Sequence, residues 1–193
     1  MEDITKNEMF FVLRLFKSPE KEYNANNMAE YLGISSMGAL KIARRLEKEN
    51  ILISKQIGKA KIYKINLKDD YVRQYLKFLL KREVEQSSSY VKMWINELKK
   101  IKNADVVILF GSTIIKKESK DIDSLIITDQ KRFIKVKKEI ENINLINIKR
   151  LHPLYQSEED FIENIKKEDL PLLSAIKGIV AFGEDKIISL MEK

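Results

Sequence analysis

The stretch of sequence that decides the fold is "NMAEYLGISSMGALKIARRLEKENIL", residues 27–52. Gly33 permits the left-handed backbone of a tight turn, and Asn24 upstream is a good N-cap, so a short helix is predicted between them. Ser35 or Ser36 can then cap the next helix. Two helices joined by a tight turn are therefore expected here.

The apolar pattern on both sides of this stretch extends the prediction. Residues 4–18 place apolar side chains at helical spacing and stop before Pro19, which predicts a first helix. After Asn50 the apolar residues alternate with period two on both sides of a turn at 57–59, which predicts a β-hairpin. The buried stripe expected in the helix before this hairpin consists of Leu40, Ala43 and Leu46.

Three helices followed by a basic hairpin resemble the winged helix-turn-helix family over about residues 5–67. The likeness is carried by residues 27–52 and by "KQIGKAKIYKIN", residues 55–66. In that family the third helix enters the DNA major groove and the hairpin, or wing, follows the backbone or minor groove. The resemblance therefore implies double-stranded DNA as a partner. The residues that it places against DNA are Ser36, Met37, Lys41, Arg44, Arg45, Lys55, Lys59 and Lys61.

Positive charge is concentrated in the same half of the chain. The 193 residues carry a formal net charge of +7, with +5 on residues 1–68, +3 on residues 69–103 and −1 on residues 104–193. A basic front half suggests that a polyanion binds there. Two alternatives stay open: the basic residues form only a solvated helix face, or the module docks a protein or a second copy. DNA is favoured because the helix and the wing are basic together.

Composition indicates a globular protein, with 44% apolar and 34% charged residues. No apolar run approaches the roughly 18 residues that span a bilayer, and the N-terminus lacks the pattern of a signal peptide, so a cytoplasmic protein without a membrane segment is expected. The absence of cysteine excludes disulfides and thiolate metal sites. The single histidine, His152, stands beside Pro153, and we assign it no role.

Residues 69–103 are predicted to be a helical connector between a domain at 1–68 and a domain at 104–193. A first helix starts with acids, as the helix dipole prefers, and a second restarts after a serine cap and carries Met93 and Trp94 on its core face. These helices could simply join the domains or present an apolar stripe to a second copy. A homodimer is expected on the second alternative.

The last 90 residues predict an α+β domain with a small mixed sheet. A helix over residues 130–143 and helical segments after residue 157, broken near Pro171, are expected beside the strands. The strands are expected over residues 104–112, 122–129 and 144–151, with a short one before a turn at Gly183.

The segments "LFGS", 109–112, and "DIDSLII", 121–127, resemble the polymerase-beta-type nucleotidyltransferase superfamily, especially its minimal members. "IKGIVAFGEDK", 176–186, is similar to their tail segment. The resemblance implies transfer of a nucleoside monophosphate with loss of pyrophosphate. It makes Asp121 and Asp123 the catalytic residues and the Mg2+ ligands. The nucleoside triphosphate would be bound by Gly111 and Ser112.

The spacing of these residues suits that chemistry. Side chains alternate along a strand, so Asp121 and Asp123 point to one side and can share divalent ions. Such transfer often uses two ions, and magnesium prefers carboxylates together with phosphates and water. Gly111 lets the backbone approach a triphosphate, and the Ser112 hydroxyl can hydrogen-bond it.

Two departures predict impaired catalysis. The superfamily usually has a third carboxylate on a later strand, and the position most like it is Asn147, an amide that binds cations poorly and cannot take up a proton. Lys149 is expected to face the same way. The loop after Gly-Ser, residues 113–120, is shorter than usual and has Ile115 where arginine is common.

The function predicted from the sequence is a DNA-binding transcriptional regulator whose C-terminal nucleotidyltransferase-like domain senses a nucleotide or oligomerises the protein. One alternative is an active transferase that the winged helix targets to a protein, an RNA or a small molecule. A second is a decayed domain kept for packing or dimerisation. A third is an antitoxin-like protein with a protein partner.

Overall fold

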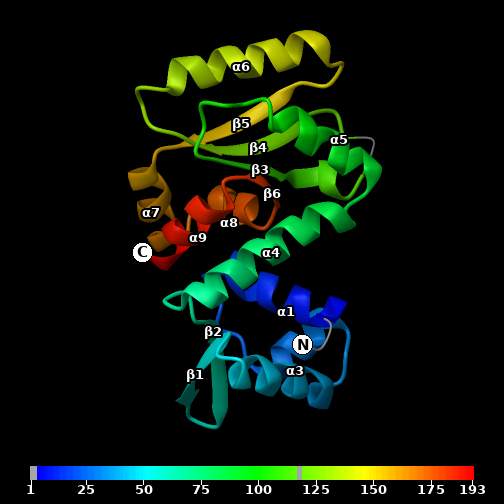
Figure 1. Ribbon diagram of the computed structural model, residues 1–193, viewed down its shortest axis with the longest axis vertical. Helices are drawn as coiled ribbons and strands as arrows, with labels where there is room; N and C mark the ends of the chain where they lie inside the picture. Colours follow the sequence, from blue (N-terminus) through cyan, green and yellow to red (C-terminus); the bar gives the residue numbers. More distant parts are fainter. Residues whose placement is uncertain (1–3, 117–118) are drawn as a thin grey trace. The chain divides into compact units, whose positions relative to one another are not determined.

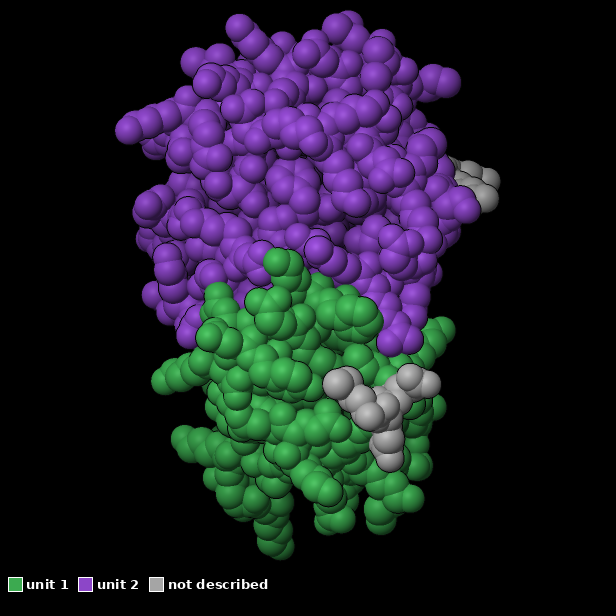
Figure 2. All heavy atoms as spheres, viewed as in Figure 1, with its two compact units in different colours: residues 1–79 green, residues 80–193 purple. Residues whose placement is uncertain are grey.

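The computed structural model describes residues 4–116 and 119–193. The chain divides into two compact units, residues 1–79 and 80–193 (Figure 2), and helix α4 (Asp70–Gln86) runs across the division. No helix among the described residues is long and apolar enough to cross a membrane.

Unit 1 is a winged helix. Three helices are followed by an antiparallel hairpin, β1 paired with β2, and a bridge between Tyr23 and Tyr63 adds a third strand position to this small sheet (Figure 1). Phe11 of the first helix packs edge-to-face on Tyr63, with ring centroids 6.3 Å apart, so the hairpin is anchored in the helical core. The elements are α1 (Lys6–Lys17), α2 (Ala25–Leu32), α3 (Ser36–Lys48), β1 (Leu52–Ile57) and β2 (Ala60–Ile65).

The caps predicted from the sequence are confirmed. The Asn24 side chain accepts hydrogen bonds from the backbone N–H groups of Asn26 and Asn27 at the start of α2. Gly33 ends that helix with φ at +65°. The Ser35 side chain accepts from the N–H of Gly38 and starts α3. Local capping chemistry therefore sets where α2 ends and where α3 begins.

Unit 2 is built on a mixed four-stranded sheet in the order β5-β4-β3-β6. β4 and β5 are parallel, with α6 as the crossover between them, and the other pairs are antiparallel. Together with the winged helix, this sheet and its helices confirm the predicted α+β fold class. The elements after α4 are α5 (Ser89–Leu98), β3 (Val106–Phe110), the 3-10 turn η1 (Gly111–Ile114), β4 (Ile122–Ile127), α6 (Phe133–Ile146), β5 (Leu151–Gln156), α7 (Glu158–Lys166), α8 (Leu170–Ile176), β6 (Ile179–Phe182) and α9 (Glu184–Glu192).

The sheet is covered on both faces (Figure 1). One face carries Val107 and Leu109 of β3 and Ile122 and Ile126 of β4, which share a core with α5 and α6. The residues between them alternate to the other face, where α7, α8 and α9 pack. Trp94 of α5 is buried in the first core as expected, whereas Met93 is exposed.

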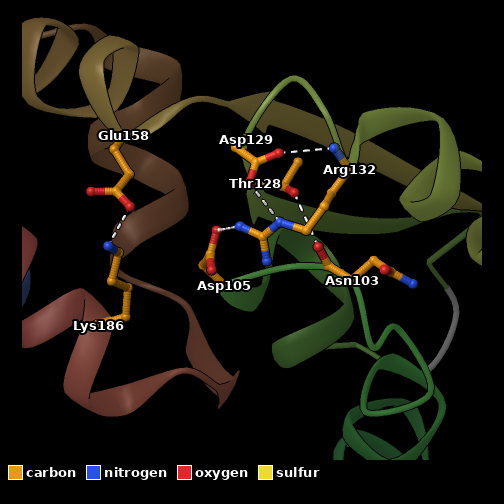
Figure 3. A network of polar contacts seen from close by, with 7 residues as sticks. All are labelled: Asn103, Asp105, Thr128, Asp129, Arg132, Glu158 and Lys186. Atoms are coloured by element: carbon orange, nitrogen blue, oxygen red, sulfur yellow. Dashed lines mark hydrogen bonds and ion pairs between the residues drawn. The ribbon is translucent and has the colours of Figure 1, made fainter.

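A polar network fixes the loops at the edge of the sheet where β3 begins and β4 ends (Figure 3). The Arg132 guanidinium donates to the carboxylates of Asp105 and Asp129, at 2.5 and 2.7 Å. The Thr128 hydroxyl donates to the carbonyl of Asn103. These contacts tie the start of α6 to the start of β3.

β5 forms one border of the sheet. Ile122 N–H donates to the Arg150 carbonyl and Thr128 N–H to the Gln156 carbonyl, so the even-numbered residues of β5 turn their backbone groups toward β4. Pro153 therefore stands at an outward position, where its missing N–H costs no bond within the sheet.

The third strand was predicted too early. Residues 144–146 complete α6, and β5 begins only at Leu151. Asn147 is the C-cap of α6, and its amide donates to Glu97 and to the Ile143 carbonyl. The apolar residues that suggested a strand are exposed to solvent: the exposed fraction is 82% for Leu145, 70% for Ile146 and 103% for Ile148.

Candidate nucleic-acid interface and acidic sheet edge

The outward face of α3 is a single basic stripe that we call the α3 stripe: Met37, Lys41, Arg44 and Lys48. These residues are exposed and recur at i, i+4, i+7 and i+11, which places them on one side of the helix. The buried residues Ala39, Ala43 and Leu46 occupy the opposite side. Lys48 was not among the predicted residues, although its helical spacing from Lys41 and Arg44 could have found it.

Arg45 does not lie on the α3 stripe. Its guanidinium is 2.9 Å from the carboxylate of Glu8 on α1 and 3.1 Å from Glu49. Glu8 is buried and also caps α1 through the backbone N–H of Thr5. Arg45 was predicted to face the groove of DNA, but the structure directs it into the helical core, where it compensates a buried carboxylate.

Of the three predicted wing lysines, Lys59 and Lys61 lie on the side that faces α3, whereas Lys55 alternates to the other face of the hairpin from Ser54. Lys55 and Lys59 are exposed, at the middle of β1 and in the turn. Lys61 instead lies 2.8 Å from a carboxylate oxygen of Glu47 on α3, and Glu47 also accepts from the Ser54 hydroxyl at 2.6 Å. Burial opposes ionisation of Glu47, but the hydrogen bonds from Lys61 and Ser54 lower its pKa. The ionised Glu47 therefore holds the wing against α3.

A groove of about 510 Å³ lies between α3, the wing and the start of α2. Its floor includes the apolar groups of Met37, Leu40 and Ala60. Ala25 and Tyr63 also line it, and its polar and basic groups come from Asn24, Asn26, Ser36, Lys59 and Lys61.

The acidic sheet edge is where β3 ends and β4 begins. Asp123 stands opposite Phe110 of β3, and Gly111 follows directly with φ at +78°. A Cβ on Gly111 would lie 2.2 Å from Oδ2 of Asp123, so the carboxylate rests against the backbone of this turn. Ser112 lies exposed in η1. The structure thus brings together Asp121, Asp123, Gly111 and Ser112, as their order in the sequence suggests.

Sequence reasoning missed His152. In the parallel β4–β5 pair His152 is the partner of Asp123, and its Nε2 lies 3.6 Å from Oδ1 of Asp121. Desolvation raises the pKa of Asp123; His152 lowers it and Asp121 adds to the rise. No short pattern in "LHPLYQ" marks the histidine, because its place beside Asp123 depends on the register of the β4–β5 pair.

A pocket of about 560 Å³ adjoins this edge. Asp123, His152 and Ser174 supply its polar groups, and the remaining lining residues are Phe110, Pro153, Leu154 and Pro171. Residues 117 and 118 of the loop after Gly-Ser lie outside the described residues, and Ile115 in the same loop is exposed.

Asn147 and Lys149 were predicted beside the acidic pair, and the structure places both elsewhere. Asn147 binds Glu97 of α5, and the Lys149 ammonium donates to the Tyr90 hydroxyl at 2.7 Å. Although burial opposes it, the hydrogen bond from Lys149 lowers the pKa of Tyr90. Both residues belong to the packing between α5 and the segment after α6.

The donor set at the acidic edge fits magnesium poorly. Among residues 4–116 and 119–193, no group of three His, Cys, Asp or Glu side chains is placed to hold a metal ion. The third group of the edge is an imidazole, whereas magnesium requires oxygen ligands in an octahedral arrangement.

Comparisons with known proteins add only distant likenesses. No family model matches the sequence, and a search of curated proteins finds no match. The heme sensor protein PefR from Streptococcus agalactiae, solved with heme, is 23% identical with a TM-score of 0.37 over 52% of this chain and 71% of its own. The adhesin competence repressor AdcR from Streptococcus pyogenes is 11% identical with a TM-score of 0.31, over 51% and 79%. ZitR from Lactococcus lactis is 14% identical with a TM-score of 0.31, over 51% and 74%. The winged-helix assignment therefore rests on the topology of unit 1.

Proposed function

We propose that this protein is a DNA-binding transcriptional regulator. The observation that carries the proposal is the α3 stripe, whose cations Lys41, Arg44 and Lys48 are all exposed beside the basic wing. No ion pair among the described residues involves Lys41 or Arg44. A protein-docking face has no need for positive charge on the helix and the wing together.

The geometry supports an assignment of roles. A helix fits the major groove of B-form DNA, and there the N-terminal half of α3 would present the exposed residues Ser36, Met37 and Lys41 toward base edges. Arg44 can pair with guanine or a phosphate. Lys55 and Lys59 of the wing would lie along the backbone, because surface lysines contact phosphates as point charges.

Binding to a duplex tests the proposal directly. Fluorescence anisotropy with a labelled duplex should show affinity at low salt that falls steeply as salt rises, because each phosphate contact releases counterions. The double variant Lys41→Gln/Arg44→Gln should lose most of this affinity. Lys137→Gln/Lys138→Gln, which removes the same charge from exposed positions on α6, is the matched control and should bind like the parent. Equal loss in both variants would show that only net charge matters and would refute a specific interface.

The C-terminal unit is proposed to be a nucleotidyltransferase-like scaffold that is impaired in catalysis. Support comes from the Gly111-Ser112 turn and the Asp121–Asp123 pair, which meet at one sheet edge in the order that the resemblance requires. Transfer itself is not proposed, because the third acidic group is missing from that edge. Incubation with labelled nucleoside triphosphates and manganese checks this, and incorporation that is lost in Asp121→Asn would reinstate the transferase.

A further inference from the structure

We infer that His152 has replaced the third carboxylate of the acidic edge, and that a histidine–carboxylate contact stands where a divalent metal centre would be. The inference rests on the proposed nucleotidyltransferase-like scaffold of unit 2 and is independent of DNA binding. It makes His152 the residue that determines whether this edge can hold Mg2+ or Mn2+.

The register of the sheet places His152 beside the acidic residues. β4 and β5 run parallel, with Ile122 opposite Leu151 and Asp123 opposite His152. Partners in a parallel pair project to the same face. Asp121, in the bend just before β4, also lies close to His152. Position 152 is therefore the place on β5 from which a side chain reaches both carboxylates. A histidine occupies it, and Asn147 lies before the strand begins.

The contacts show how the edge is arranged around that histidine. Nε2 of His152 is 3.6 Å from Oδ1 of Asp121, so the imidazole lies in the space in which an ion bound to Asp121 would need its next ligand. Asp123 turns toward Gly111, where even a Cβ would come within 2.2 Å of its Oδ2. His152 is thus the neighbour that the two carboxylates share: it lies near Asp121 and pairs with Asp123, which itself rests close to the backbone of Gly111.

The ligand preferences of metal ions also indicate that this edge is unsuited to Mg2+ or Mn2+. Two divalent ions bring a charge of about +4, which a set of three carboxylates and substrate phosphates can offset. Replacing one carboxylate by imidazole removes a negative charge and an oxygen donor together. Imidazole suits zinc, copper or nickel, whereas magnesium and manganese favour oxygen ligands.

Manganese binding to the full-length protein tests the inference, with the free ion measured by electron paramagnetic resonance. The parent should show no saturable site, and His152→Asp should bind Mn2+ at least about tenfold more tightly, because carboxylate charge count sets affinity for such ions. His152→Asn, nearly isosteric with aspartate but uncharged, should bind like the parent. Asp121→Asn added to His152→Asp should abolish the gain.

Each result decides the matter. A gain in His152→Asp that requires Asp121 supports the inference. Saturable binding by the parent that disappears in Asp121→Asn would overturn it, as would a folded His152→Asp protein without any gain. His152→Glu repeats the test if the aspartate variant does not fold. Duplex binding by the same proteins is measured in parallel, so failure here leaves the DNA-binding proposal standing and is distinguishable from its failure.

Discussion

Glu47 of α3 and Lys61 of the wing form an ion pair, with 2.8 Å between Nζ and a carboxylate oxygen, within the surface proposed to meet DNA. The pair orients the wing, but it also places a negative charge near the expected path of phosphates and occupies one lysine.

Removing that charge should strengthen binding to DNA. In Glu47→Gln, Lys61 is released toward phosphate, so affinity for a non-specific duplex should rise and the salt dependence should steepen by about one phosphate contact. Anisotropy titrations at several salt concentrations measure both. Glu49→Gln, whose carboxylate pairs with Arg45 instead, is the control and should leave affinity unchanged. Weaker binding by Glu47→Gln would mean that orientation of the wing outweighs the charge.

Arg44 and Arg45 are adjacent, but replacing Arg44 should weaken DNA binding, whereas replacing Arg45 should lower stability. Arg44→Ala should weaken binding to a cognate duplex by about 1–3 kcal/mol if it contacts a base, with little change in stability. Arg45→Ala leaves Glu8 buried without its cation and should lower the free energy of unfolding of unit 1 by about 1–3 kcal/mol. Urea denaturation followed by circular dichroism, beside the DNA titration, separates the two. The assignment of Arg44 to DNA contact and of Arg45 to the ion pair with Glu8 is wrong if the two variants exchange these effects.

The raised pKa of Asp123 predicts a dependence of stability on pH. Its cause is mainly desolvation, so the folded state holds the proton more tightly than the unfolded state does. Stability should therefore fall as pH rises from the ordinary carboxyl pKa of 3.8 through the raised value, and this loss should persist at neutral pH. Asp123→Asn cannot ionise and should lack that part of the dependence. Melting temperatures of both proteins between pH 3 and 8 should converge at the acidic end and diverge above it; parallel curves would contradict the cause.

Gly111→Ala should be more destabilising than a positive φ alone explains. Gly58, with φ at +57° and no described atom within 4 Å of where a Cβ would lie, supplies the control: Gly58→Ala should cost about 1 kcal/mol through backbone strain. Gly111→Ala adds the clash with Asp123 and should cost about 1–3 kcal/mol more, as overpacking does. Chemical denaturation gives both values. Asp123→Ala should recover the difference, and its failure to do so would show that the carboxylate is not what excludes the methyl group.

Local signals in the sequence were sufficient for unit 1. Asn24, Gly33 and Ser35 each act through neighbours within four residues, so pattern reasoning placed the helices correctly. Arg45 could not be distinguished from Arg44 in the same way, because its partner Glu8 is distant in sequence and only the folded core brings them together.

The start of β5, and therefore its register against β4, could not be predicted from the sequence pattern. The apolar residues Leu145, Ile146 and Ile148 suggested a strand, yet the helix continues to Ile146, and this crossover connects the parallel strands β4 and β5. Asn147 was therefore assigned to the acidic edge in place of His152. That Gly111, Asp121 and Asp123 meet at one sheet edge was readable from their order, but the group opposite them depends on a parallel pairing that no short motif specifies.

Pro153 has a consequence for self-association. On the outer side of β5 the Leu151 N–H already donates to the Asn144 side chain, and Pro153 has no N–H. Among the outward-facing residues of this strand, this leaves only the Tyr155 N–H as a donor for a further strand. With so few donors on this side, edge-to-edge addition of a second molecule to β5 is disfavoured, and so is the growth of fibrils from this strand.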